Sequence, residues 1–163
     1  MLAPTARRPG FHPGYGISKT DEGLLEWSWA EERLLASRNY WIGTTGRGGR
    51  PHAIPVWGLW FEGGVVFGTN RSSLKAKNLA RDPRVVVHLE SGDEVVILEG
   101  VVEEIAEPSR LREIEDAYSA KYEFESDLSG EGSVTYELRP QVALAWMESD
   151  YPRTATRFEF ESA

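Results

Sequence analysis

The central stretch of the sequence runs from Gly64 to Glu90 and reads GVVFGTNRSSLKAKNLARDPRVVVHLE. It opens with an apolar β-branched run that ends at Gly68, and it closes with a second such run after Asp82-Pro83. Proline stops a helix because it lacks a backbone donor and crowds the preceding turn. The pattern therefore predicts a strand, a hydroxyl-rich turn, one short helix and a second strand.

This stretch concentrates positive charge in an acidic chain. Between residues 70 and 84 five cations face one acid, a net charge of +4, whereas the whole chain carries −8. The cations are Arg71, Lys75, Lys77, Arg81 and Arg84. Ser72 or Ser73 can cap the helix, and a helix start offers unpaired N–H groups to an anion. With the hydroxyls of Thr69 and Ser73, this pattern favours a phosphate site over a helix whose lysines only face solvent.

Composition excludes several classes of protein. A pI near 5.0 argues against a nucleic-acid partner, which requires a basic face. The chain has no cysteine, so it has no disulfide, no catalytic thiolate and no cysteine-ligated metal. Its histidines, His12, His52 and His88, lie too far apart in the sequence to suggest a metal site. The longest apolar run, residues 53–61, is interrupted by proline and glycine, so we expect no membrane span and a cytoplasmic protein.

The 163 residues predict one domain over residues 17–163, preceded by an arm over residues 1–16 that is flexible or lies across another surface. Six tryptophans suggest apolar surface kept for a ligand or a partner subunit. Ser28 and Glu31 have capping-box spacing, which predicts a helix to about Ser37 with Leu34 and Leu35 facing inward. A strand over 39–45 and a hairpin turn over 46–49 follow.

Residues 50–61, RPHAIPVWGLWF, predict a long strand with Pro55 in its middle. Because proline cannot donate to a ladder, this position belongs at a sheet edge or a bulge. Either the strand turns a barrel corner there, or a flat ligand lies against it, and both can hold. With strands 39–45 and 64–69, this segment predicts an antiparallel meander.

The second half of the chain predicts further strands around one helix. A strand over 95–105 bends at Gly100, and Pro108 opens a helix whose apolar residues recur to Tyr122. An acidic loop over 123–133 precedes strands over 134–138, 141–148 and 156–160. Together these elements predict a mainly β (α+β) fold, an antiparallel β-barrel with flanking short helices.

Four segments, in their order and spacing, carry a resemblance to a known family. They are residues 49–57 (GRPHAIPVW), 66–69 (VFGT), 73–85 (SLKAKNLARDPRV) and 99–102 (EGVV). The sequence resembles the pyridoxamine 5′-phosphate oxidase-like, FMN-binding split β-barrel superfamily, whose fold is of Greek-key type. Arg139-Pro140, Ala145-Trp146 and residues 156–160 resemble the branch of deazaflavin (coenzyme F-420)-dependent oxidoreductases.

The resemblance implies a homodimer that binds FMN or coenzyme F-420 in a groove at its interface. The residues implied to hold the cofactor phosphate are Thr69, Ser73, Lys75, Lys77 and Asn78. Those implied to line the ring are His52, Ile54, Pro55, Val56 and Trp57. Trp146 and Arg157 are implied to reach in from the second chain.

The implied activity is hydride transfer between the bound cofactor and a small organic substrate. The chain has Ala53-Ile54 where pyridoxamine phosphate oxidases place an arginine, and it lacks their arginine-rich C-terminal segment, so we expect a different substrate. No catalytic residue is assigned, although His52 is the best-placed titratable group. Two alternatives stay open: a protein of this fold that sequesters flavin, deazaflavin or haem without turnover, and a cofactor-free module that recruits an acidic partner.

Overall fold

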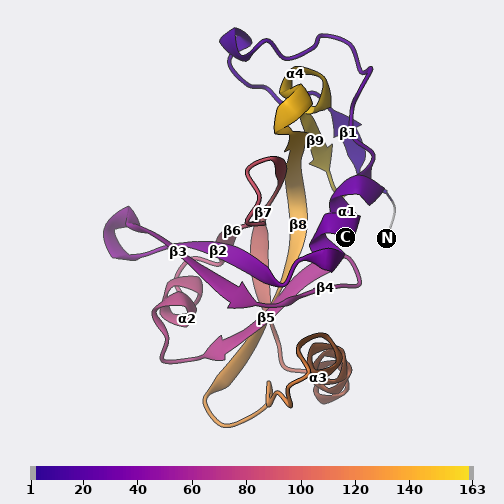
Figure 1. Cartoon of the computed structure of the whole chain (residues 1–163). Coiled ribbons are helices and arrows are strands. Elements are labelled where there is room, and N and C mark those ends of the chain that lie inside the picture. The colour runs from indigo at the N-terminus through magenta and orange to yellow at the C-terminus, as the bar shows by residue number, and fades with distance from the viewer. Residues whose placement is uncertain (1–2, 162–163) are drawn as a thin grey trace.

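The computed structural model describes residues 3–161, which form antiparallel strands flanked by short helices (Figure 1). The strands are β1 (Thr5–Arg7), β2 (Asn39–Thr45), β3 (Pro51–Trp57), β4 (Leu59–Phe61), β5 (Gly64–Asn70), β6 (Arg84–His88), β7 (Glu94–Ile105), β8 (Ser133–Met147) and β9 (Thr156–Glu159). The helices are α1 (Trp27–Ala36), α2 (Leu74–Leu79), α3 (Pro108–Tyr122) and α4 (Tyr151–Thr154), with 3-10 turns at Pro13–Tyr15, Arg47–Gly49 and Glu148–Asp150. The predicted fold class is confirmed. No helix within residues 3–161 is long and apolar enough to span a membrane.

The long strand β8 connects three other strands, because one of its edges pairs with two different strands in succession. The sheet path is β1-β9-β8-β7-β6-β2-β3, and all pairs are antiparallel. One edge of β8 pairs with β7 throughout, while the other pairs with β5 as far as Leu138 and with β9 from Val142. The sequence predicted two strands here, and that prediction is wrong: Pro140 lies within one continuous strand, at the change of partner, where its missing donor costs no ladder bond.

The predicted bend at Gly100 is confirmed. Gly100 lies opposite Pro140, and the β7–β8 register shifts between Glu99 and Gly100. A Cβ atom added at Gly100 would lie 2.8 Å from the backbone oxygen of Arg139, closer than a carbon and an oxygen can pack. A larger residue here would therefore push the two long strands apart at the bulge.

The sheet curls toward itself but does not close, as in a split barrel. The strand β3 ends the path next to β2, whereas β4 pairs with β5, which in turn pairs with β8. The edge position predicted for Pro55 is confirmed. The continuous strand predicted over 50–61 is wrong, because the chain breaks at Gly58, where an added Cβ would lie 2.8 Å from Val66 O. The predicted meander is therefore two separate pairs, β2–β3 and β4–β5.

The helix α1 packs on the core through Ala30 and Leu34, which are fully buried. It begins at Trp27 without a side-chain cap, so the capping box predicted at Ser28 is wrong. Tertiary packing explains the earlier start, because the Trp27 ring lies 5.2 Å from the ring of Phe158. The inward position predicted for Leu34 is confirmed, but Leu35 is 59% exposed.

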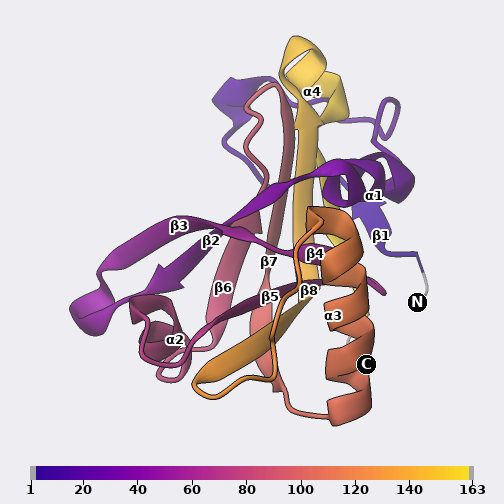
Figure 2. The same cartoon turned by 60° about the horizontal axis from the view of Figure 1, so that its bottom comes forward.

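The helix α3 buries a second apolar cluster at the open end of the barrel. Figure 2 shows it lying beside β4. Ile114, Tyr118 and Tyr122 are buried with Leu59 of β4 and Val66 of β5, as the periodicity of the sequence predicted. This packing places the last turn of α3 next to the break at Gly58.

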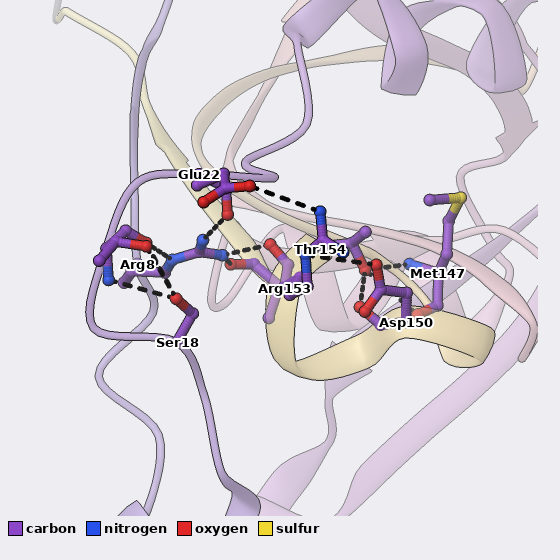
Figure 3. Close-up of polar contacts among 9 residues, drawn as sticks. Arg8, Ser18, Glu22, Met147, Asp150, Arg153 and Thr154 are labelled. Carbon is purple, nitrogen blue, oxygen red and sulfur yellow. Dashed lines mark hydrogen bonds and ion pairs between the residues drawn. The ribbon is translucent and has the colours of Figure 1, made fainter.

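The N-terminal segment is tied to the C-terminal one. The strand β1 pairs with β9, and the Phe11 ring stacks on that of Tyr151 in α4. The Arg8 guanidinium lies between the two segments (Figure 3) and donates to carbonyls on both at 2.5–3.1 Å. These carbonyls belong to Thr20, Glu22, Arg153 and Ala155. Neither β1 nor α4 was predicted from the sequence.

We expect Arg8→Met to lower the free energy of unfolding by about 2 kcal/mol, because several carbonyls lose a charged donor at once. Chemical denaturation measures this loss. Arg7→Met is the matched control: Arg7 pairs with Glu159, and both side chains are more than a third exposed, so the loss should stay below about 1 kcal/mol. Equal losses in the two variants would contradict the structural role of Arg8.

Candidate functional site

The turn before α2 is organised by two side chains. Asn70 Oδ1 accepts from the backbone N–H and the hydroxyl of Ser72 at 2.8 and 2.6 Å. Of the two serines considered as caps, Ser73 takes the role, and its Oγ accepts from Ala76 N at 3.1 Å. The cap starts the six-residue helix α2, which ends at Leu79, before Asp82-Pro83. The strand–turn–helix–strand order predicted from the sequence is confirmed.

Three of the predicted phosphate-binding residues form one hydrogen-bonded group. Lys75 Nζ donates to Thr69 Oγ1 at 3.0 Å, and Thr69 Oγ1 donates to Ser73 Oγ at 3.2 Å. Lys75 is 8% exposed, and this burial lowers the pKa of its ammonium. An ammonium has three donors, so the single bond to Thr69 leaves capacity for an anion. A buried ammonium without a carboxylate partner gains most when an anion binds beside it.

Asn78 ties α2 to β2. Its side chain is 1% exposed, its Nδ2 donates to Thr44 Oγ1 at 3.1 Å, and its Oδ1 accepts from Arg81 at 3.3 Å. Arg81 also donates to Thr45 O at 2.7 Å. The structure therefore gives Asn78 the role of fixing α2 against the sheet, and it fixes the Arg81 guanidinium with it.

A groove of about 780 Å³ lies between α2 and the β2–β3 hairpin. Its lining includes four cations and no carboxylate: Arg47, Arg50, Lys77 and Arg81. His52 and Asn78 line it together with Lys77, so three of the predicted site residues meet here, whereas the hydrogen-bonded group of Thr69, Ser73 and Lys75 lies outside this lining. We refer to it as the cationic groove. Its volume lies within the usual range for small-molecule sites.

The residues predicted to line a ring lie on two faces of β3. Strand alternation places His52, Ile54 and Val56 on one face, and Pro55 and Trp57 on the other. Val56 packs on the core, whereas Ile54 and Trp57 are 38% and 40% exposed. The Nδ1 atom of His52 is shielded from solvent and has no hydrogen-bond partner within the described residues. A buried ring nitrogen in this state can take a partner from a ligand.

Trp57 marks the far end of β3. Its ring stacks on that of Tyr122 with centroids 4.6 Å apart and planes 9° apart, and the Arg38 guanidinium lies 5.4 Å from both rings. Trp57 lies five positions after His52, which is about 16 Å of strand at ~3.3 Å per residue. The site thus has a cationic end and an aromatic end, joined by the exposed edge of β3.

Trp146 and Arg157, the residues implied to reach the cofactor from a second chain, lie away from the groove. Trp146 packs against Phe11 and Tyr151, and Arg157 Nε donates to Glu159 Oε1 at 3.1 Å. They belong to β8 and β9, whereas the cationic groove borders β2 and β3 at the opposite end of the sheet path. A single chain therefore does not bring them to the groove.

Sequence reasoning missed several residues of the site. Arg47 and Arg50 flank the glycine turn, and their only signal was charge beside a hairpin. Arg38 and Tyr122 surround Trp57 but come from distant segments. Of the other histidines, half-buried His88 stacks on Trp41, and His12 caps Gly14 N at 3.1 Å. Within residues 3–161, no group of three potential metal ligands occurs.

Comparison with protein families assigns the chain. The family model described as pyridoxamine 5′-phosphate oxidase matches residues 30–155, which include the cationic groove and all of β3 and α2. The chain belongs to the pyridoxamine 5′-phosphate oxidase family. Among curated proteins, none matches the sequence.

Solved structures of this pyridoxamine 5′-phosphate oxidase fold include proteins with different described roles. A conserved hypothetical protein of Mycobacterium tuberculosis aligns with a TM-score of 0.69 at 24% identity, covering 80% of this chain and 90% of that one. An F420 reductase aligns with a TM-score of 0.56 at 19% identity, covering 69% and 94%. A haem-binding protein of Mycobacterium smegmatis aligns with a TM-score of 0.59 at 22% identity, covering 73% and 53%. At these identities the likeness establishes the fold.

The aromatic end of the site has a titratable group beneath it. Lys121 Nζ donates to Gly58 O at 2.8 Å and to Tyr40 Oη at 3.3 Å. Burial, with the nearby Arg38 charge, lowers the pKa of Lys121 to about 8. Burial also raises the pKa of the facing phenols, Tyr40 and Tyr122.

We expect the free energy of unfolding to rise as pH increases from about 8 to 9.5. In that window the unfolded chain still holds the Lys121 proton that the folded chain has released, so higher pH favours the folded state. Above about pH 10 the unfolded tyrosines ionise first, and stability falls again. Urea denaturation across this range should show the full rise in the wild type and in Lys19→Met, and a smaller rise in Lys121→Met, where buried Lys75 still contributes. A rise in Lys121→Met that equals the wild-type rise would contradict the role of Lys121.

Proposed function

We propose that this protein binds FMN or coenzyme F-420 along β3 and acts as an oxidoreductase on a small organic substrate. The observation that carries the proposal is the cationic groove, in which four cations and no carboxylate line about 780 Å³ beside a strand with an exposed edge. An acidic chain that gathers cations at one concave site is built to attract an anionic ligand there. When bound, the cofactor supplies the hydride chemistry itself.

The residues present fit the anionic end of such a cofactor. Lys75 keeps donor capacity beyond its bond to Thr69, and with Ser73 it would bind phosphate at the start of α2, outside the lining of the groove. Lys77 offers a further cation to the ligand from within the groove. Asn78 and Thr44 hold α2 in place, so these groups are positioned before the ligand arrives. Preorganised donors favour binding because little side-chain freedom is lost.

The residues of β3 fit the aromatic end. Between the cationic groove and Trp57 the strand carries Ile54 on one face and Pro55 on the other, so a flat ring at its edge can lie against the backbone and one of these apolar side chains. The separation of about 16 Å between His52 and Trp57 suits an elongated ligand with an anion at one end and a ring at the other. His52 Nδ1, which has no partner within the described residues, would accept or donate a hydrogen bond at the ligand's polar groups.

A second chain would complete the site. Trp146 and Arg157 are remote from the groove in their own chain and would reach it only from a partner related by symmetry. The outer sheet face beside His52 supports such contact, because it forms a broad depression that contains Gly43, Ala53 and half-exposed Val86. We propose a homodimer in which each chain contributes to both sites.

A non-catalytic role in the same fold is the second candidate. It is favoured by the haem-binding description of one structural neighbour, and the groove could sequester flavin, deazaflavin or haem without turnover. The two candidates differ in one measurable property, the reduction of substrate by the loaded protein. A cofactor-free module that recruits an acidic partner would bind none of these ligands.

Fluorescence titration of the purified protein with FMN, and separately with coenzyme F-420, tests the proposal. We expect micromolar or tighter binding of at least one. Lys75→Met should weaken that binding by about tenfold or more, the value of a lost charge-assisted hydrogen bond. The control Lys19→Met removes an exposed lysine that does not line the groove and should leave affinity unchanged. Equal affinity in Lys75→Met and wild type would remove the phosphate assignment.

Light scattering tests the shared site. We expect a mass of about twice the 18.3 kDa of one chain, because Trp146 and Arg157 need a partner to reach the groove. A protein that binds cofactor as a monomer of 18.3 kDa would overturn the roles proposed for both residues.

A further inference from the structure

A separate cavity of about 260 Å³ opens on the far side of Trp57. It lies between the end of β3, the end of β5, α3 and the segment of residues 123–133. Trp57, Tyr118 and Phe124 form aromatic walls, and Gly68 and Thr69 line it from β5. We call it the aromatic cavity. Its lining shares no residue with that of the cationic groove.

One polar group in the wall of this cavity has no partner. The hydroxyl of Ser126 is shielded from solvent and has no hydrogen-bond partner within the described residues. Thr69, by contrast, is already engaged with Lys75 and Ser73. A shielded hydroxyl without a partner destabilises the protein, so such groups normally meet a ligand or a water. Asp127 is the next residue, and among the described residues its carboxylate accepts only from the Ser129 hydroxyl, at 3.4 Å.

The wall that carries Ser126 is held in place. Glu115 of α3 accepts from the backbone N–H groups of Leu128 and Ser129 at 2.9 and 3.1 Å, and from the Ser129 hydroxyl at 3.2 Å. Leu128 packs over Gly68, where an added Cβ would lie 2.6 Å from Leu128 Cδ2. The acidic segment is therefore a fixed wall of the cavity, built from both α3 and β5.

We infer that the aromatic cavity binds a small planar aromatic molecule with a polar hydrogen, such as an aromatic amine or a phenol. The rings of Trp57 and Phe124, whose centroids are 6.2 Å apart, provide faces and edges for the ring. The exposed Asp127 carboxylate accepts the polar hydrogen, and the Ser126 hydroxyl joins it when its side chain turns from the wall toward the ligand. The cavity volume limits the ligand to one or two rings.

The position of the cavity assigns a role to this ligand. Trp57 borders the cavity and also ends the strand along which the cofactor ring is proposed to lie, so the bound molecule would be the organic substrate. This second step rests on the proposed function. The binding site itself depends only on the described residues.

Protein-observed NMR titration of the cofactor-free protein with phenol, aniline and toluene tests the site. The three ligands are similar in size, and toluene lacks a polar hydrogen. We expect phenol and aniline to shift resonances of residues around the cavity and to bind at least about fivefold more tightly than toluene. Ser126→Ala and Asp127→Asn should each reduce this preference, while toluene affinity stays the same. A preference unchanged in both variants, or shifts confined to other surfaces, would overturn the inference.

Two further measurements separate binding from structure. Because the Ser126 hydroxyl has no partner to lose, Ser126→Ala should keep or raise the melting temperature, and the control Ser119→Ala on α3 should alter neither stability nor phenol binding. A melting temperature lowered in Ser126→Ala would contradict a hydroxyl without a partner.

The cavity inference and the proposed function can fail separately. Phenol binding without flavin or deazaflavin binding would overturn the proposed function and support the ligand site in the aromatic cavity. Cofactor binding without phenol binding would support the proposed function and overturn the ligand site.

Discussion

The break in the sheet at Gly58 determines the rest of the site. A buried backbone N–H and C=O without strand partners must find other groups, and here the C-terminal turn of α3 supplies them. Gly58 N donates to the Tyr122 hydroxyl at 2.8 Å, and Gly58 O accepts from Tyr122 and Lys121, each at 2.8 Å. The barrel can therefore stay open between β3 and β5 only while α3 is docked there. The same contact positions Tyr122 under Trp57, so the aromatic end of the site depends on it too.

The opening leaves β3 as an edge strand with its ends in different environments. At one end the hairpin brings Arg47 and Arg50 opposite α2, and at the other Trp57 lies among aromatic rings. Pro55 protects this edge from pairing with another strand, because it presents no donor in the middle of the strand. An edge that cannot be extended by a strand remains available to a flat ligand. The overall negative charge of the chain disfavours anions in general, whereas the four cations of the groove attract them locally.

Local signals allowed much of this to be predicted from sequence. The strand, cap, short helix and proline stop between Gly64 and Glu90 depend on neighbours in the chain, and the apolar period of α3 likewise reports its buried face. What could not be predicted depends on tertiary contacts. The break at Gly58 follows from the approach of Val66, α1 begins early because Trp27 packs on Phe158, and β1 forms only because β9 offers an edge. Arg47 and Arg81 are 34 residues apart in sequence, so no spacing rule could place them in one groove.

The change of partner along β8 divides the molecule into two cooperative units. Up to Leu138 the strand pairs with β5 and belongs to the barrel. From Val142 it pairs with β9, which in turn pairs with β1. Since no ladder bond with β5 or β9 crosses Pro140 on that edge, β9, β1 and α4 can detach without breaking a bond of the β5 ladder. The terminal unit can thus open without unpairing the barrel strands, but its opening exposes Phe158, which is fully buried in the main core against Trp27 of α1. We therefore expect the strands at the two ends of the chain to tolerate substitutions better than the barrel strands do.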